Sequence, residues 1–152
     1  TPDPAKAIGS LPRFLKAGGK IALTIYERKP WTLLNAKYLI RPLTKRMNKR
    51  LLLFLIQAAM PIFYPVTLIL FHLPFFGKIF KFIIPVADYP LSSGLSWMQR
   101  YHCVVLDTFD MLSPQFDHPQ TQAEVIAALS SSGVVNIKRP RASQLNFVGE
   151  KG

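Results

Sequence analysis

The hydrophobic pattern begins as helix, turn and strand. Asp3 suits a helix cap and Pro4 a first helical residue, and apolar positions then recur at helical spacing. We expect Pro12 to kink this helix or to restart it after Ser10. A glycine pair then stops the helix, and the run KIALTIY (residues 20–26) follows. Its β-branched, apolar composition predicts a strand buried on both faces, as in a parallel sheet.

The middle of the chain, residues 28–95, has a different pattern. A helix is expected over about residues 31–47, and Pro42 should bend or end it. Residues 51–77 then form a run of 27 residues without Asp, Glu, Lys or Arg. Because prolines interrupt this run, we predict two or three short helices, divided at Pro61–Pro65 and Pro74.

From Ser96 the pattern again indicates a globular domain, after a loop by composition over residues 88–95. Helices are predicted over residues 96–112 and about 122–131; the second starts with the capping box Thr121–Glu124. Two short strands should follow, at 134–139 and 145–150, joined by a turn around Pro140. Helix–strand alternation predicts an α/β layered fold. Three strands make a poor independent sheet, so we expect the parallel partners of the first strand to be missing from these residues.

Charge is distributed unevenly along the 152 residues, which carry a net charge of +11. Residues 1–50 hold 12 Lys or Arg and only 2 Asp or Glu, and this basic stretch adjoins the uncharged run. The hydrophobic content of 49% excludes a disordered chain. A single cysteine and three scattered histidines exclude a disulfide framework and predict no metal site. No signal peptide is recognisable at the start, so we expect a cytoplasmic location.

Residues 45–86 are open to three interpretations. The uncharged run is long enough to cross a bilayer, and the basic cluster before it would suit a cytoplasmic flank. Prolines near its middle would leave carbonyl groups unsatisfied in hydrocarbon, which favours short helices. Such helices would cover a lipophilic pocket, or cover it and also touch the membrane surface peripherally.

Several segments together resemble class I S-adenosylmethionine-dependent methyltransferases. TPDP at residues 1–4 resembles a stretch that follows the fourth strand of that family, and LPRFLKAGGKIAL (11–23) resembles the next helix and its turn into the fifth strand. DTFDMLSPQFDH (107–118) and residues 121–134 resemble a later segment and helix of one subgroup. The resemblance covers about half of the chain, at both of its ends.

This resemblance implies a fold class: the C-terminal half of a Rossmann-like α/β methyltransferase fold, with strands five to seven and an apolar helical insertion. Residues 1–27 and 96–152 would form the partial core, and residues 28–95 a hydrophobic lid. The glycine-rich turn that binds S-adenosylmethionine in this family is absent from the chain. The resemblance therefore places the main cofactor-binding half upstream of Thr1, and the chain alone should be inactive.

The candidate site residues follow from strand ends and from the resemblance. Ligands bind beyond the carboxyl ends of strands in open α/β sheets, and a histidine can act as a general base. His102 and Cys103 are neighbours on a helix, point to different sides and are not a nucleophile pair. The candidates are His118 and Asp110 as catalytic residues, Tyr26, Glu27, Trp31 and Asp107 for substrate, and Thr1 and Pro2 for the cofactor.

The predicted function is transfer of a methyl group from S-adenosylmethionine to a small lipophilic acceptor. The alternative is a small basic protein that is anchored in a membrane or lies at its surface, with no enzymatic role. A nucleic-acid partner is not expected, because the basic residues adjoin an apolar run and the aromatic residues show no stacking pattern.

Overall fold

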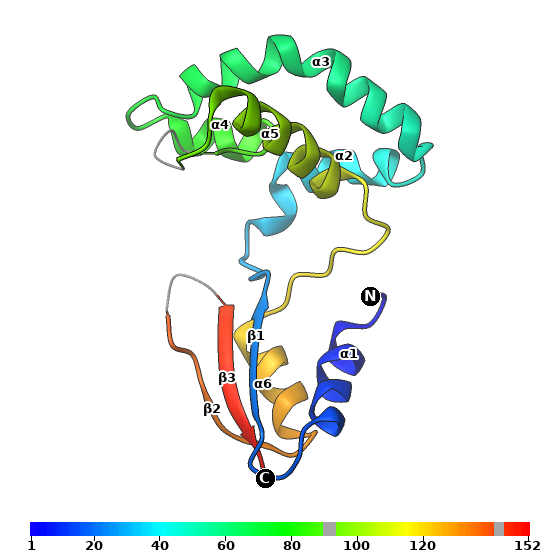
Figure 1. Cartoon of the computed structure of the whole chain (residues 1–152), viewed down its shortest axis with the longest axis vertical. Coiled ribbons are helices and arrows are strands. Elements are labelled where there is room, and N and C mark those ends of the chain that lie inside the picture. The colour runs from blue at the N-terminus through cyan, green and yellow to red at the C-terminus, as the bar shows by residue number, and fades with distance from the viewer. Residues whose placement is uncertain (90–93, 142–144) are drawn as a thin grey trace. The chain divides into compact units, whose positions relative to one another are not determined.

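The computed structural model describes residues 1–89, 94–141 and 145–152. The chain forms two compact units (Figure 1). The sheet unit contains residues Thr1–Pro30 and Phe116–Gly152, and the helical unit contains Trp31–Gln115. The described residues form six α-helices and a small three-stranded antiparallel sheet, so the fold is mixed α/β. Part of the predicted loop at 88–95, and part of the segment after Pro140, lie outside the described residues.

The sheet unit begins as its sequence predicts. Asp3 caps α1 (Pro4–Ser10) by accepting a hydrogen bond from the Lys6 backbone N–H at 2.9 Å. The 3-10 turn η1 (Leu11–Phe14) replaces the α-helix at Pro12. Gly18 then takes a φ of 73°, which favours glycine, and β1 (Lys20–Ile25) follows.

The second half of the sheet unit supplies a helix and two strands. The capping box of Thr121 and Glu124 starts α6 (Gln122–Ser130), as predicted. Gly133, with a φ of 83°, separates the helix from β2 (Val134–Lys138). A third strand, β3 (Leu145–Lys151), lies between the other two in the sheet and runs antiparallel to both.

Helices cover one face of this sheet. Leu23 pairs with Phe147 and Ile25 with Leu145 in the antiparallel ladder, and these side chains point to the face that packs against α1 and α6. The other face carries exposed positions, among them Ala22. The prediction of a strand buried on both faces was therefore wrong for β1. Its inner side chains are half-buried, and its ladder partner is antiparallel.

The buried core of the sheet unit consists of apolar side chains from α1, α6, β2 and β3: Ile8, Val125, Ala128, Leu129, Val134, Leu145 and Phe147.

The helical unit contains η2 (Thr32–Leu34), α2 (Ala36–Thr44), α3 (Lys49–Leu70), α4 (Gly77–Ile83) and α5 (Trp97–Leu112). Its core lies between α3 and α5 and consists of Leu52, Ile56, Met60, Tyr64, Val104, Val105 and Leu112. The helix predicted over residues 96–112 is confirmed as α5. It packs with the apolar helices, whereas the sequence placed residues 96–112 with the methyltransferase-like core.

Proline divides the long apolar run only in part as predicted. The division at Pro74 is confirmed, because this residue lies in the turn between α3 and α4, whereas the division at Pro61–Pro65 was wrong. One continuous helix, α3, passes through Pro61 and Pro65, and Figure 1 shows it as a curved helix. Both prolines, and Gln57 one turn earlier, are exposed, so the carbonyl groups that lose an N–H partner lie on the outer side of the helix. Likewise, α2 continues through Pro42 to Thr44. Helix α3 is long and apolar enough to cross a membrane, with 28% of its most apolar window buried.

The amphipathic helix α2 packs with its polar side inward. Arg41 Nη2 donates to the Pro114 carbonyl and Thr44 Oγ1 to the Leu112 carbonyl, both at 2.8 Å, and both side chains are buried. Lys49 Nζ donates to the Ser113 carbonyl at 2.6 Å. The last carbonyls of a helix lack partners within it, and cations are favoured there. Three side chains therefore cap the end of α5, and the apolar side of α2 faces outward.

The turn between α3 and α4 is tight. The Phe76 N–H donates to the Pro74 carbonyl at 2.8 Å, which makes a three-residue turn centred on Phe75. Phe75 has a φ of 66°, in the left-handed region that a bulky residue rarely adopts. The Gly77 N–H donates to the Leu73 carbonyl at 3.0 Å.

We predict that Gly77→Ala destabilises the helical unit. A Cβ at this position would lie 2.3 Å from the Phe71 carbonyl oxygen, which belongs to rigid backbone. We expect a loss of about 1–3 kcal/mol in the free energy of unfolding, measured by urea denaturation. The control is Gly9→Ala in α1, where the nearest atom is 3.7 Å away and alanine should be neutral or stabilising. Equal midpoints for Gly77→Ala and the wild type would contradict the prediction.

Candidate functional site

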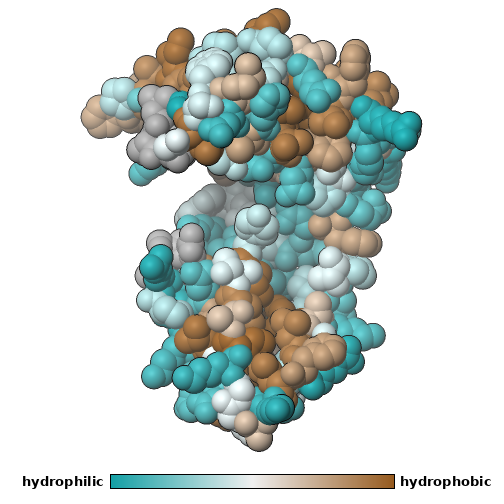
Figure 2. Space-filling model, in the orientation of Figure 1, coloured by the Kyte–Doolittle hydropathy of each residue, from teal (hydrophilic) through white to brown (hydrophobic). Residues whose placement is uncertain are grey.

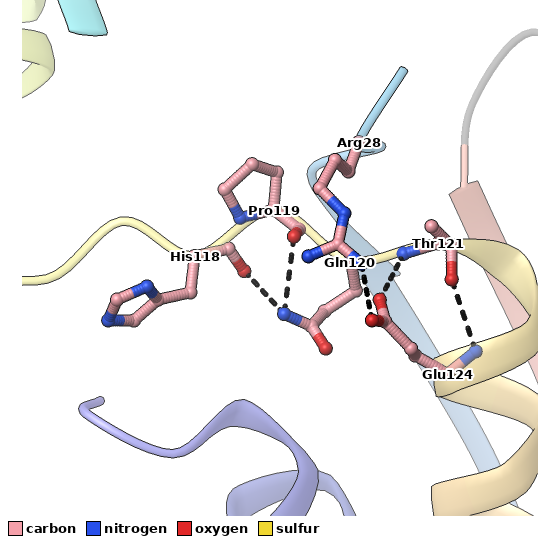
Figure 3. Close-up of polar contacts among 6 residues, drawn as sticks. All are labelled: Arg28, His118, Pro119, Gln120, Thr121 and Glu124. Carbon is pink, nitrogen blue, oxygen red and sulfur yellow. Dashed lines mark hydrogen bonds and ion pairs between the residues drawn. The ribbon is translucent and has the colours of Figure 1, made fainter. Parts of the chain in front are cut away.

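Polar residues gather at the carboxyl end of β1 within the sheet unit. The Gln120 N–H donates to the Tyr26 carbonyl at 2.9 Å, and the Arg28 N–H donates to the Gln120 carbonyl at 2.8 Å. These bonds form a parallel bridge between Glu27 and Gln120. Gln120 is itself buried, and its side chain donates to the carbonyls of His118 and Pro119 (Figure 3). The bridge places the segment containing His118 beside the end of β1.

Arginine side chains neutralise both acidic groups near this strand end. Arg139 Nη2 lies 3.2 Å from Glu27 Oε1, and its Nη1 donates to Gln122 at 2.9 Å. Arg28 pairs with Glu124, as Figure 3 shows. The predicted substrate residue Glu27 is thus held in an ion pair. Its neighbour Tyr26 is 75% exposed, which leaves the phenol ring accessible to a ligand.

His118, the predicted general base, is exposed in the same unit. Its ring lies 6.1 Å from that of Phe116, centroid to centroid, and its backbone carbonyl is bound by Gln120. In Figure 3 the imidazole points away from the Arg28–Glu124 pair. Its place beside the end of β1 agrees with a role in a ligand site there.

The remaining substrate and catalytic candidates belong to the helical unit. Asp107 and Asp110 lie one turn apart on α5, and both are exposed. Asp107 accepts a hydrogen bond from the Tyr89 hydroxyl. Trp31 precedes η2 and is 56% exposed. The catalytic role of Asp110 stays a prediction.

Thr1 and Pro2, the cofactor candidates, are exposed just before α1. The Thr1 hydroxyl donates to the Asp3 carbonyl at 3.3 Å, which helps to order the helix start. Among the described residues, no group of three or more His, Cys, Asp or Glu side chains is arranged to hold a metal ion.

The sequence did not identify Arg139, Arg28 and Gln120 as parts of this strand-end cluster. Arg139 follows β2, 112 residues after its partner Glu27, so no local spacing signals the contact. For Gln120 the available signal is its position just before the capping box, which fixes where the returning chain meets the sheet.

Comparison of the chain with family models, with curated proteins and with solved structures found no match.

The first prediction from these contacts concerns Tyr89. Its hydrogen bond to Asp107, burial and the aspartate's charge raise the pKa of Tyr89 from 10.0 to about 12. We expect Asp107→Asn to lower this pKa towards 10.0, because the charged acceptor is lost. Absorbance of tyrosinate against pH measures it, with Tyr89→Phe identifying the residue. An unchanged titration in Asp107→Asn would contradict the assignment.

The second prediction concerns Glu124 and acid stability. The Thr121 backbone N–H donates to its carboxylate at 2.8 Å, and this bond, with Arg28, lowers the pKa of Glu124 below 4.5. A lowered folded-state pKa contributes stability that is present above pH 4.5 and lost as the pH falls through the folded-state value. We expect Glu124→Gln to flatten the fall in unfolding free energy between neutral and acidic pH. A wild-type pH dependence in Glu124→Gln would contradict this.

Proposed function

We propose that this chain is the C-terminal portion of a methyltransferase that transfers a methyl group from S-adenosylmethionine to a small lipophilic acceptor. The resemblance set out above supports this reading. Two segments that carry it, residues 11–23 and 121–134, fall on the turn-to-strand and capped-helix elements of one compact unit.

The observation that carries the proposal is the incomplete sheet. In the described part of the chain, β1 pairs along one edge with β3, and its other edge has no strand over Lys20–Ile25. An open strand edge presents unpaired backbone groups that can pair with a further strand. The sheet face that bears Ala22 and Val148 is also exposed. Both features favour a unit whose sheet is continued, and whose second face is covered, by further strands and helices.

Methyl transfer requires little acid–base chemistry from the residues of the site. Methyl transfer from a sulfonium depends mainly on proximity and alignment of the acceptor. Tyr26, at the carboxyl end of β1, would contact the acceptor, and His118 beside it would accept a proton from an acceptor hydroxyl. The apolar character of residues 51–86 favours a lipophilic acceptor.

The test begins with the coding DNA upstream of Thr1. We expect an open frame that encodes an apolar strand followed by a glycine-rich turn, and we expect its full product to bind S-adenosylmethionine in calorimetry. Labelled methyl should pass to lipophilic acceptors with that product and not with residues 1–152 alone. A full product that binds no S-adenosylmethionine would overturn the proposal. Turnover by residues 1–152 alone would overturn the part of it that assigns cofactor binding to residues upstream of Thr1.

In the full product, His118→Asn should lower kcat while leaving the affinity for S-adenosylmethionine unchanged, because it removes the base and no cofactor contact. The effect of losing a general base is about 100-fold or more for a hydroxyl acceptor. Phe116→Leu, which changes the neighbouring ring, is the matched control. An unchanged kcat would remove His118 from the mechanism.

A further inference from the structure

We infer that the helical unit docks peripherally on the surface of an anionic lipid bilayer, through the turn between α3 and α4 and the outer side of α3. This interaction surface goes beyond the proposed methyl transfer and does not depend on it. The turn is called the phenylalanine tip below, and it consists of Leu73, Phe75 and Phe76.

The phenylalanine tip holds large apolar side chains in water. Phe75 is 94% exposed and Phe76 is 59% exposed. Phe75 is also held in the left-handed conformation, which costs free energy for a bulky residue, and Gly77 leaves no room for a side chain behind it. Strained backbone of this kind persists where its surroundings enforce it, and it clusters at ligand sites. The turn therefore fixes an aromatic side chain in an outward position.

The outer side of α3 continues the apolar surface from the tip. Ile62, Phe63, Val66 and Ile69 are each between 46% and 71% exposed, while Met60, Tyr64 and Thr67 pack inward. Figure 2 shows hydrophobic side chains among more polar ones over α3. Scattered exposed apolar residues are ordinary, but a contiguous run on one helix and its turn marks an interaction site.

The charged residues of the helical unit indicate which partner its apolar surface binds. Within the helical unit, residues 31–87 hold eight Lys or Arg and no Asp or Glu. Lys78 and Lys81 follow the phenylalanine tip on α4, and a basic cluster at 45–50 lies at the start of α3. In the described structure the carboxylates of the unit lie on α5 or, for Asp88, pair with Lys81 at 2.6 Å. Apolar surface with basic residues at both ends fits a bilayer with anionic headgroups.

A hollow beside the phenylalanine tip is lined by both apolar and basic side chains. It has a volume of about 530 Å³ and is lined by Phe71, Leu73, Phe75, Gly77, Lys78 and Lys81. The Lys81 ammonium lies 6.0 Å from the centre of the Phe71 ring. Lys81 is paired with Asp88, so Lys78 is the lysine of this lining that would contact a headgroup phosphate while the phenylalanines enter the acyl boundary.

The prolines of α3 indicate how far this helix enters the bilayer. The carbonyl groups of Gln57 and Pro61 lose their helical N–H partners, and both residues are exposed. Hydrocarbon cannot satisfy such groups, whereas water and headgroups can. A helix of 22 residues, about 33 Å long, would therefore lie along the surface and not cross it.

The experiment is co-sedimentation of residues 1–152 with large vesicles. One set is phosphatidylcholine alone, and the other contains phosphatidylglycerol at about a quarter of the lipid, enough to make the surface anionic. We expect binding to the anionic vesicles, at least tenfold weaker binding to phosphatidylcholine, release by high salt and release by alkaline carbonate. Absence of binding to anionic vesicles, equal binding to both sets or retention in carbonate would each overturn the inference.

Variants locate the surface. Phe75→Asn removes the ring and suits the left-handed backbone, so the fold should be retained, and binding should fall about tenfold or more. Lys78→Gln should weaken binding to anionic vesicles about fivefold and leave binding to phosphatidylcholine unchanged. The matched control is Phe14→Asn, because Phe14 is 75% exposed in the sheet unit. Equal losses in Phe75→Asn and Phe14→Asn would overturn the assignment to the tip.

The proposals of methyl transfer and of membrane docking are tested by independent measurements. Vesicle binding is measured without S-adenosylmethionine, and cofactor binding by the full product is measured without lipid. Loss of one result therefore leaves the other standing.

Discussion

The antiparallel ladder between β1 and β3 is the interaction on which the sheet unit depends. It joins residues more than a hundred positions apart, such as Leu23 and Phe147, and these side chains form the floor on which α1 and α6 pack. The bridge between Glu27 and Gln120 extends this contact to the strand end. Because the helical unit is inserted between the two segments, the chain must form these long-range contacts to close the sheet unit, at an entropic cost that grows only slowly with loop length.

The sequence predicted the elements whose signals are local. Asp3 at a helix start, the glycine pair that begins at Gly18 and the Thr121–Glu124 box each act within four residues, and each lies where it was expected. The strand end at Tyr26 and Glu27 followed from the same local reasoning. The partners of that strand end did not, because Arg139 and Gln120 reach it only through the fold. The sequence therefore predicted where a candidate site lies, but it did not predict which residues contact each other there.

The errors concern proline and packing. Pro61 and Pro65 each remove one helical hydrogen bond, but packing of the inner side of α3 against α5 outweighs those two losses, and the freed carbonyls face outward. The sequence predicted a helix around α2, and it could not show which side of that helix is buried. The carbonyls at the end of α5, which have no partner within that helix, decide this, because they accept hydrogen bonds from Arg41 and Thr44 of α2.

This capping interaction also determines the character of the surface. An amphipathic helix in a soluble unit normally buries its apolar side, which stabilises the fold. Here the stabilising contacts are polar. Apolar side chains such as Leu39 and Leu43 remain 68% exposed, so their burial does not stabilise the unit. Together with the strained, exposed Phe75, this is the arrangement expected where the missing burial comes from outside the chain. A bilayer surface supplies such burial and also matches the absence of carboxylates from α2 to α4.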